Sequence, residues 1–154
     1  MLSGKLNDGR VIRLWFTQRL FNALLGIIFQ WLEQKSKTSN EVTRHVEQAF
    51  AQEAAVSSTQ PQEAVLSEGV NRSMLVQAVD TISAENEISM NFRIDENNPN
   101  SEAYVFTIAE FHLRQWLHSL RALYLRAGWS DMHWPEWVKV KAEIKVSSVT
   151  TTMH

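Results

Sequence analysis

The sequence predicts an α+β fold, in which a mainly antiparallel sheet carries two long helices packed on one face. Residues 88–94 and 104–108 alternate apolar and polar side chains with the period of half-buried strands. The polar residues 96–101 between them are typical of a turn. Residues 113–127 then space their apolar side chains as one face of a helix. This part of the chain is therefore expected to form strand, strand and helix.

A similar order is predicted at the amino-terminal end. Asp8-Gly9 is a dipeptide that tight hairpin turns favour, because its backbone tolerates positive φ. Residues 11–16 alternate as a strand, and Thr17 has the side chain of a helix N-cap. We expect a helix from there to about Lys35.

The helix expected after Thr17 has more apolar surface than one sheet can cover. Its apolar residues span an arc of roughly 200°, against roughly 120° for the helix at 113–127. A second apolar neighbour is expected, which is the other helix, another copy of the protein or a membrane surface. A transmembrane span is not expected, because the apolar run is shorter than about 20 residues. The residues expected to bind a partner here are Phe21, Leu25, Phe29 and Leu32.

Residues 36–69 differ in character from their surroundings. Thr38 and Glu41 have the spacing of a capping box, which predicts a weak helix after them. Ser, Thr, Gln and Pro then predominate, which indicates a loop. We interpret 36–69 as a weakly helical or flexible insertion in a single α+β domain that spans residues 1–154.

A pattern repeat with an offset of 93 residues places Leu113 and Leu117 on Leu20 and Leu24. Strands expected at 74–82 and 138–146 then follow the two helices in corresponding positions. The repeat predicts two β-β-α-β units in a pseudo-twofold arrangement, with sheet edges available for pairing.

Composition and charge limit the classes of function. The chain has 154 residues, no cysteine and a net charge of −2, so disulfides and cysteine-ligated metal sites are excluded. The charge is uneven: residues 1–40 carry +4, residues 41–102 carry −8 and residues 103–154 carry +2. The amino terminus lacks the pattern of a secretory signal, so a cytoplasmic location is expected.

The sequence has no motif that identifies an enzyme. It lacks a glycine-rich phosphate loop, a G-x-S-x-G elbow and an H-E-x-x-H pair. Asp131, His133 and Glu136 lie in one loop, but their spacing matches no established metal site. We therefore expect no catalytic residues, no metal and no cofactor.

Tryptophans and lysines near the carboxyl-terminal end are the remaining candidates for binding. Trp129, Trp134 and Trp137 are interpreted either as a hydrophobic plug or as aromatic anchors for a partner. The lysines that share one face of the strand expected at 138–146, together with a basic residue on a neighbouring strand, are candidates for binding single-stranded nucleic acid. These basic residues are Arg93, Lys139, Lys141 and Lys145.

The stretch F-R-I-D-E-N-N-P-N-S-E-A-Y-V-F-T-I-A-E-F-H-L-R-Q-W-L, residues 92–117, resembles the Whirly and Pur-type regulators. Those families lay a helix across a curved antiparallel sheet, often in a twofold or pseudo-twofold arrangement. The resemblance implies binding of single-stranded nucleic acid.

The function expected from these observations is a small, non-catalytic, cytoplasmic interaction module. It is expected to form a homo-oligomer, or to bind a protein partner, through an apolar helix or a sheet edge. The alternatives are a single-stranded nucleic-acid-binding regulator and a peripheral membrane protein.

Overall fold

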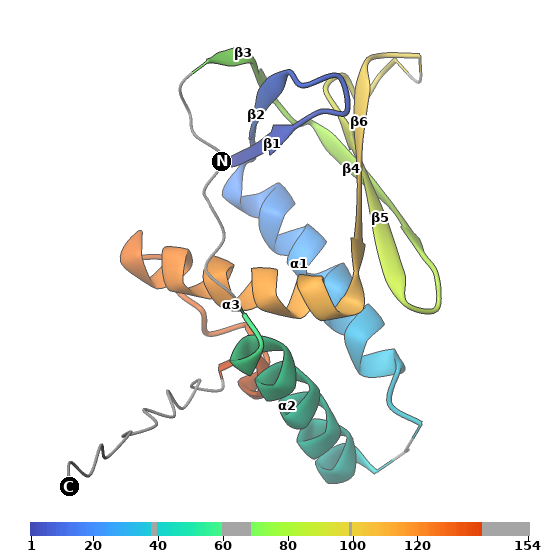
Figure 1. Ribbon diagram of the computed structural model, residues 1–154, viewed down its shortest axis with the longest axis vertical. Helices are drawn as coiled ribbons and strands as arrows, with labels where there is room; N and C mark the ends of the chain where they lie inside the picture. The colour runs from blue at the N-terminus through green and yellow to red at the C-terminus, as the bar shows by residue number, and fades with distance from the viewer. Residues whose placement is uncertain (38–39, 60–68, 99, 140–154) are drawn as a thin grey trace, which may run out of the picture.

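The computed structural model describes residues 1–37, 40–59, 69–98 and 100–139, and it confirms the α+β class (Figure 1). The described residues form three long helices and a short 3₁₀ helix, η1 (Glu136–Lys139). The long helices are α1 (Gln18–Gln34), α2 (Glu41–Ser57) and α3 (Glu110–Arg126). The strands are β1 (Leu2–Lys5), β2 (Val11–Trp15), β3 (Val70–Leu75), β4 (Ala78–Ser83), β5 (Glu87–Arg93) and β6 (Ala103–Ala109).

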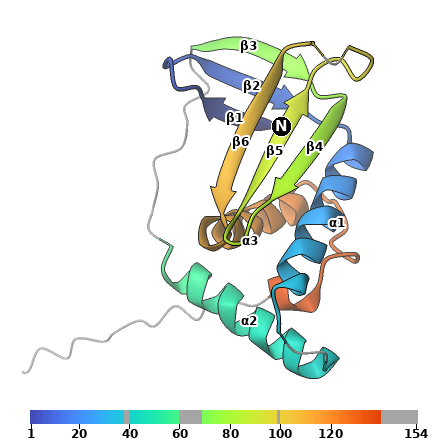
Figure 2. The same cartoon turned by 90° about the vertical axis from the view of Figure 1, so that its right-hand side faces the viewer.

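The strands form two three-stranded sheets instead of the one sheet expected. In the mixed sheet, β2 lies between β1, which is antiparallel to it, and β3, which is parallel to it. In the antiparallel sheet, β5 lies between β4 and β6 (Figure 2). The expected strand at 74–82 covers the end of β3 and most of β4, which belong to different sheets.

The dipeptide Val76-Gln77 carries the chain from one sheet to the other. The backbone N–H of Val76 donates to the carbonyl of Trp15 in the mixed sheet, with an N–O distance of 2.9 Å. The next backbone N–H, that of Gln77, donates to the carbonyl of Arg93 in the antiparallel sheet, also at 2.9 Å. Two consecutive peptide groups therefore belong to different sheets.

Local signals mark the start of α1 and the β1–β2 turn, as expected, and also the end of α3. Thr17 is the N-cap of α1, and its side-chain oxygen accepts from the backbone N–H of Leu20 at 3.2 Å. In the β1–β2 hairpin, Gly9 has a φ of 87°. Gly128 follows the C-cap of α3 with a φ of 72°, a conformation that suits glycine.

The insertion contains a longer helix than the sequence suggested. Helix α2 has 17 residues, the same length as α1 and α3. Its N-cap is Asn40, whose side-chain oxygen accepts from the backbone N–H groups of Val42 and Thr43. The expected capping box relied on Thr38, which lies outside the described residues.

The expected strand at 138–146 is wrong where it can be compared. Val138 and Lys139 belong to η1, which follows Pro135, and Val138 is completely buried. The backbone N–H of Val138 donates to the carbonyl of Pro135 at 3.0 Å, which closes a helical turn here. Residues 140–146 lie outside the described residues. The hairpin-then-helix order does occur twice, in β1-β2-α1 and in β5-β6-α3.

None of the helices that the structure describes has the length and apolar character needed to cross a membrane.

Candidate functional site

Helix α2 directs glutamine side chains into the protein. Gln48 and Gln52 are both buried, and Gln52 has no exposed surface. The Gln48 amide donates to the carbonyl of Leu32 near the end of α1, with an N–O distance of 2.8 Å. The Gln52 amide donates to the carbonyl of Arg114 in α3 at 2.9 Å. These two hydrogen bonds fix which side of α2 faces the rest of the chain.

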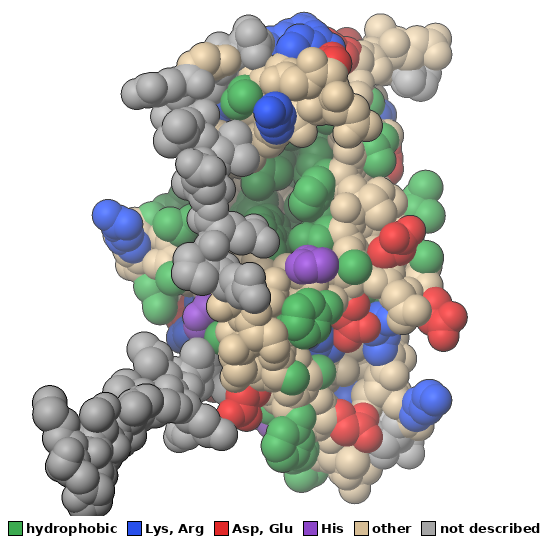
Figure 3. Space-filling view, in the orientation of Figure 1, with side chains coloured by type: hydrophobic (Ala, Val, Ile, Leu, Met, Phe, Trp, Pro, Cys, Tyr) green, Lys and Arg blue, Asp and Glu red, His purple; other side chains and the backbone are tan. Residues whose placement is uncertain are grey.

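A row of apolar residues lies on the exposed side of α2. Val42, Val46 and Phe50 are 73%, 44% and 68% exposed. Their spacing of four residues places them in one row, which we call the α2 stripe. Hydrophobic side chains reach the surface over α2 and over the beginning of α3 in the space-filling view (Figure 3). Helix α2 therefore buries two glutamines together with Ala55 and Val56 and leaves three larger apolar side chains exposed, whereas an ordinary surface helix buries its apolar side.

A buried ionic group supports the inner side of α2. Arg114 of α3 is 2% exposed and donates to Glu110 at 2.8 Å and to the Gln48 side-chain oxygen at 2.7 Å. Its guanidinium also lies over the Trp137 ring, 5.5 Å from the ring centre. Burial lowers the pKa of Arg114, an effect that its interactions with Glu110 oppose. Arg114 therefore acts as an internal connector between helices.

Glu110 is the acidic partner in this group. It contacts Arg114 and also Lys35, whose Nζ lies 3.0 Å from Glu110 Oε2. Partial burial acts to raise the pKa of Glu110, but hydrogen bonds from Arg114 and Lys35 outweigh it and hold the pKa below its ordinary value. The carboxylate is thus kept charged between two cations.

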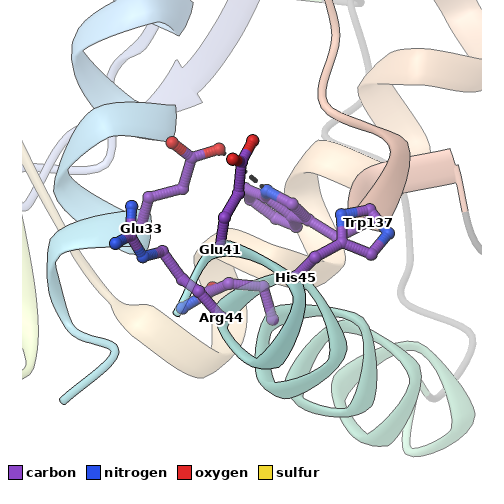
Figure 4. A pocket seen from close by; sticks show the side chains of 6 residues that line it. Glu33, Glu41, Arg44, His45 and Trp137 are labelled. Carbon is purple, nitrogen blue, oxygen red and sulfur yellow. Dashed lines mark hydrogen bonds between the residues drawn. The ribbon is translucent and has the colours of Figure 1, made fainter. Parts of the chain in front are cut away.

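A polar pocket of about 310 Å³ lies between α1, α2 and η1 (Figure 4). Glu33 comes from α1, and Glu41, Arg44 and His45 come from α2. The indole N–H of Trp137 donates to Glu33 Oε1 at 3.0 Å. Within the described part of the chain, no group of three or more His, Cys, Asp or Glu side chains is arranged to hold a metal ion. The pocket therefore offers hydrogen-bonding groups to a ligand but no metal centre.

The four α1 residues expected to bind a partner lie in the core. Phe21, Leu25, Phe29 and Leu32 are all buried. Phe29 packs against the rings of Trp134 and Trp137, at centroid distances of 5.4 and 6.0 Å. Phe21 packs against Trp116 and Tyr124 of α3. The second apolar neighbour of α1 is therefore supplied by α3 and by the tryptophan-rich segment after it. Binding of a partner by these four residues remains a prediction, and their buried location does not support it.

The three tryptophans have different environments. Trp134 and Trp137 are buried against α1, where they act as a hydrophobic plug. Trp129 is partly exposed and packs edge-on against Tyr124, with 5.0 Å between ring centres. Of the three, only Trp129 presents substantial surface to solvent.

The basic residues expected to bind nucleic acid do not form one surface in the described structure. Arg93 is on β5 and pairs with Asp80 of β4 at 2.8 Å. Lys139 is on η1 and pairs with Glu136 at 2.6 Å. Lys141 and Lys145 lie outside the described residues. Nucleic-acid binding therefore remains a prediction that these positions do not strengthen.

The sequence analysis missed the α2 stripe as a surface. Val42, Val46 and Phe50 lie in the weak helix expected after Glu41, and the apolar residues of a helix are ordinarily buried. The signal that identifies the inner side is the spacing of Gln48 and Gln52, four residues apart. That signal is weak without the carbonyl groups that the glutamines bind.

Comparison of the chain with protein-family models, with curated proteins and with solved structures found no match.

Proposed function

We propose that the chain is a non-catalytic interaction module that binds a protein partner through the α2 stripe. The observation that carries the proposal is the exposure of Val42, Val46 and Phe50 on a helix that buries Gln48 and Gln52. Fully burying a valine or phenylalanine side chain contributes about 1.5–3 kcal/mol. A partner that covers the stripe would recover this free energy.

Rotation of α2 within the chain is a poor alternative way to cover the stripe. Such a rotation would break the hydrogen bonds from Gln48 to Leu32 and from Gln52 to Arg114. It would also remove the Gln48 side-chain oxygen from the buried Arg114 guanidinium, and a buried polar group that loses its partner costs about 1–3 kcal/mol. The inner side of α2 is therefore specified, and the stripe stays outside.

An apolar surface beside the stripe enlarges the area available to a partner. Ala51 and Ala54 of α2 line a shallow depression together with Ala109 and Phe111 at the beginning of α3. Phe111 is itself exposed. Small side chains allow another helix to approach closely, so the partner surface expected here is an apolar helix face or groove.

Site-specific photo-crosslinking tests the proposal. Phe50 is replaced by p-benzoylphenylalanine in the cells that produce the chain, and the analogue at Ile82 is the control. Ile82 is 74% exposed on the antiparallel sheet. Irradiation is expected to give a discrete protein adduct from position 50 and none from position 82. Mass spectrometry of the adduct then shows whether the partner is a second copy or another protein.

A second substitution makes the crosslinking result specific to the stripe. Val46→Glu places a charge one helical turn from Phe50 and is expected to abolish the adduct without unfolding the protein, since Val46 is exposed. The same adducts from positions 50 and 82, or an adduct that survives Val46→Glu, would reject the α2 stripe as the binding surface.

A further inference from the structure

In the part of the chain that the structure describes, β6 is an edge strand of the antiparallel sheet. Among the described residues, β6 has one neighbouring strand, β5 (Figure 2). Just beyond the strand, the backbone N–H of Glu110 donates to the carbonyl of Asn86 at 2.8 Å. This bond identifies which residues of β6 bond to β5, because alternate residues of an antiparallel strand direct both their N–H and their C=O toward the same neighbouring strand.

The register identifies the backbone groups that point outward. The β5–β6 pairing is regular, from Glu87 opposite Ala109 to Arg93 opposite Ala103. Counting back from Glu110 in steps of two, Ile108, Phe106 and Tyr104 direct their N–H and C=O toward β5. The residues that direct these groups away from β5 are Ala103, Val105, Thr107 and Ala109.

The β6 edge lacks the features that usually prevent strand pairing. Its sequence, A-Y-V-F-T-I-A, contains no charged residue and no proline. Its pairing with β5 contains no bulge. Natural edge strands are commonly blocked by lysine, proline or a bulge. The opposite edge, β4, differs because it carries Asp80, which pairs with Arg93.

We propose that β6 accepts an extended segment of a partner protein as a fourth strand of the antiparallel sheet. The outward N–H and C=O groups of four residues require a partner with a regular, extended backbone. Tyr104 and Ile108 pack against the core, and the exposed Phe106 lies on the same face of β6 by alternation, so the segment has apolar side chains at alternate positions. Val105 and Thr107 on the other side favour β-branched neighbours.

Charge adds a smaller preference. Glu102 and Glu110 lie just beyond the two ends of β6, so basic residues at the ends of the segment are complementary. Both carboxylates already have basic neighbours, Arg72 and Arg114. The backbone groups therefore define the occupant, and the flanking charges only tune its affinity. This edge meets the depression beside the α2 stripe at Ala109, but binding at the edge does not depend on the stripe.

The probe for the test is a synthetic peptide, K-V-T-V-T-V-T-K, acetylated and amidated at its ends. Two variants carry N-methyl groups on every valine or on every threonine. In an added strand, only alternate N–H groups bind β6, so one methylated peptide is expected to bind and the other to fail. With valines on the core side, failure of the threonine-methylated peptide indicates antiparallel addition, and failure of the valine-methylated peptide indicates parallel addition.

A matched pair of protein variants tests the same edge. Val105→Pro removes an outward N–H without removing a bond to β5, and proline is tolerated at such positions of edge strands. Its affinity for the peptide is expected to fall about tenfold or more. Val105→Thr keeps the N–H and is expected to bind the peptide as the unmodified protein does.

Hydrogen exchange of the full chain gives the direct readout. The amides of Val105 and Thr107 are expected to become protected when the peptide binds, whereas the Phe106 amide is already protected by β5. Equal binding of both methylated peptides, failure of both, or unchanged affinity in Val105→Pro would overturn the proposal. Protection of Val105 and Thr107 in a homodimer without peptide would overturn the partner segment as the occupant.

Discussion

The side-chain amide of Gln52 donates to the backbone carbonyl of Arg114, joining α2 to α3 across 62 positions of the sequence. The carbonyl of Arg114 is within a helix, so the glutamine supplies a second hydrogen bond to an acceptor that has two lone pairs. A completely buried amide at this position makes the α2–α3 contact specific in both position and rotation.

Gln52→Ala is expected to lower the free energy of unfolding by about 2–3 kcal/mol, because it removes this hydrogen bond and leaves a cavity. Glu53→Ala, on the exposed side of the same turn, is expected to change it by less than about 0.5 kcal/mol. Urea unfolding followed by circular dichroism measures both values. Equal effects would show that α2 is not held by its inner side.

Trp137 has two separable roles, as a ring in the core and as a donor to Glu33. Trp137→Phe keeps an aromatic ring but loses the indole N–H, and is expected to cost about 1 kcal/mol together with some loss of packing. Trp137→Ala is expected to cost about 3–5 kcal/mol. Chemical denaturation of the two variants separates the roles; similar losses would indicate that the hydrogen bond dominates.

Tyr124 is expected to make stability depend on alkaline pH. Burial raises its pKa from 10.0 to about 12. The folded protein therefore retains the phenol proton at a pH where the unfolded chain has lost it, so stability is full below pH 10 and falls as pH rises through about 12. Unfolding measured across this range should show a steeper decline for the unmodified protein than for Tyr124→Phe.

The raised pKa of Tyr124 can also be measured directly in the folded protein. Ultraviolet titration of the phenolate band gives an independent reading, since Tyr124→Phe should remove the later of the tyrosine transitions. A transition of Tyr124 at the ordinary tyrosine value would show that its hydroxyl, which donates to Asn22 at 3.0 Å, is open to solvent.

Glu110 is expected to contribute to acid unfolding. Its pKa in the folded protein is held below its ordinary value. Its charge-dependent stabilisation is therefore present above the unfolded-state pKa, about 4.3, and is lost as pH falls through the lower folded-state pKa. Glu110→Gln should show a weaker dependence of unfolding free energy on pH in this acidic range. A parallel dependence in both proteins would contradict the assignment.

Features set by nearby residues were predictable from the sequence. Thr17 begins α1 and Gly128 follows the end of α3, because capping depends on groups within one helical turn. The alternation in β5 and β6 likewise identified both strands. The excess apolar arc of α1 correctly required a second apolar neighbour.

Features set by distant partners were not predictable. The outward position of Val42, Val46 and Phe50 depends on carbonyl groups of α1 and α3 that only the folded structure brings to α2. The division into two sheets occurs at Val76-Gln77, which contains neither glycine nor proline to mark a break. The sequence pattern near Val138 continues like a strand, but Val138 lies in a 3₁₀ turn that packs against α2 and α3.

The passage of the chain from one sheet to the other at Val76-Gln77 limits how the two sheets can move relative to each other. A hinge between the two sheets would have to rotate about the backbone torsions of this dipeptide. The N–H of Val76 is bound to the mixed sheet and the N–H of Gln77 to the antiparallel sheet. Opening it would break at least one of those bonds and uncover Val76, which is 1% exposed. The two sheets should therefore tumble as one rigid body, with slow amide exchange at both positions, and a partner bound at β6 would also restrain the amino-terminal hairpin.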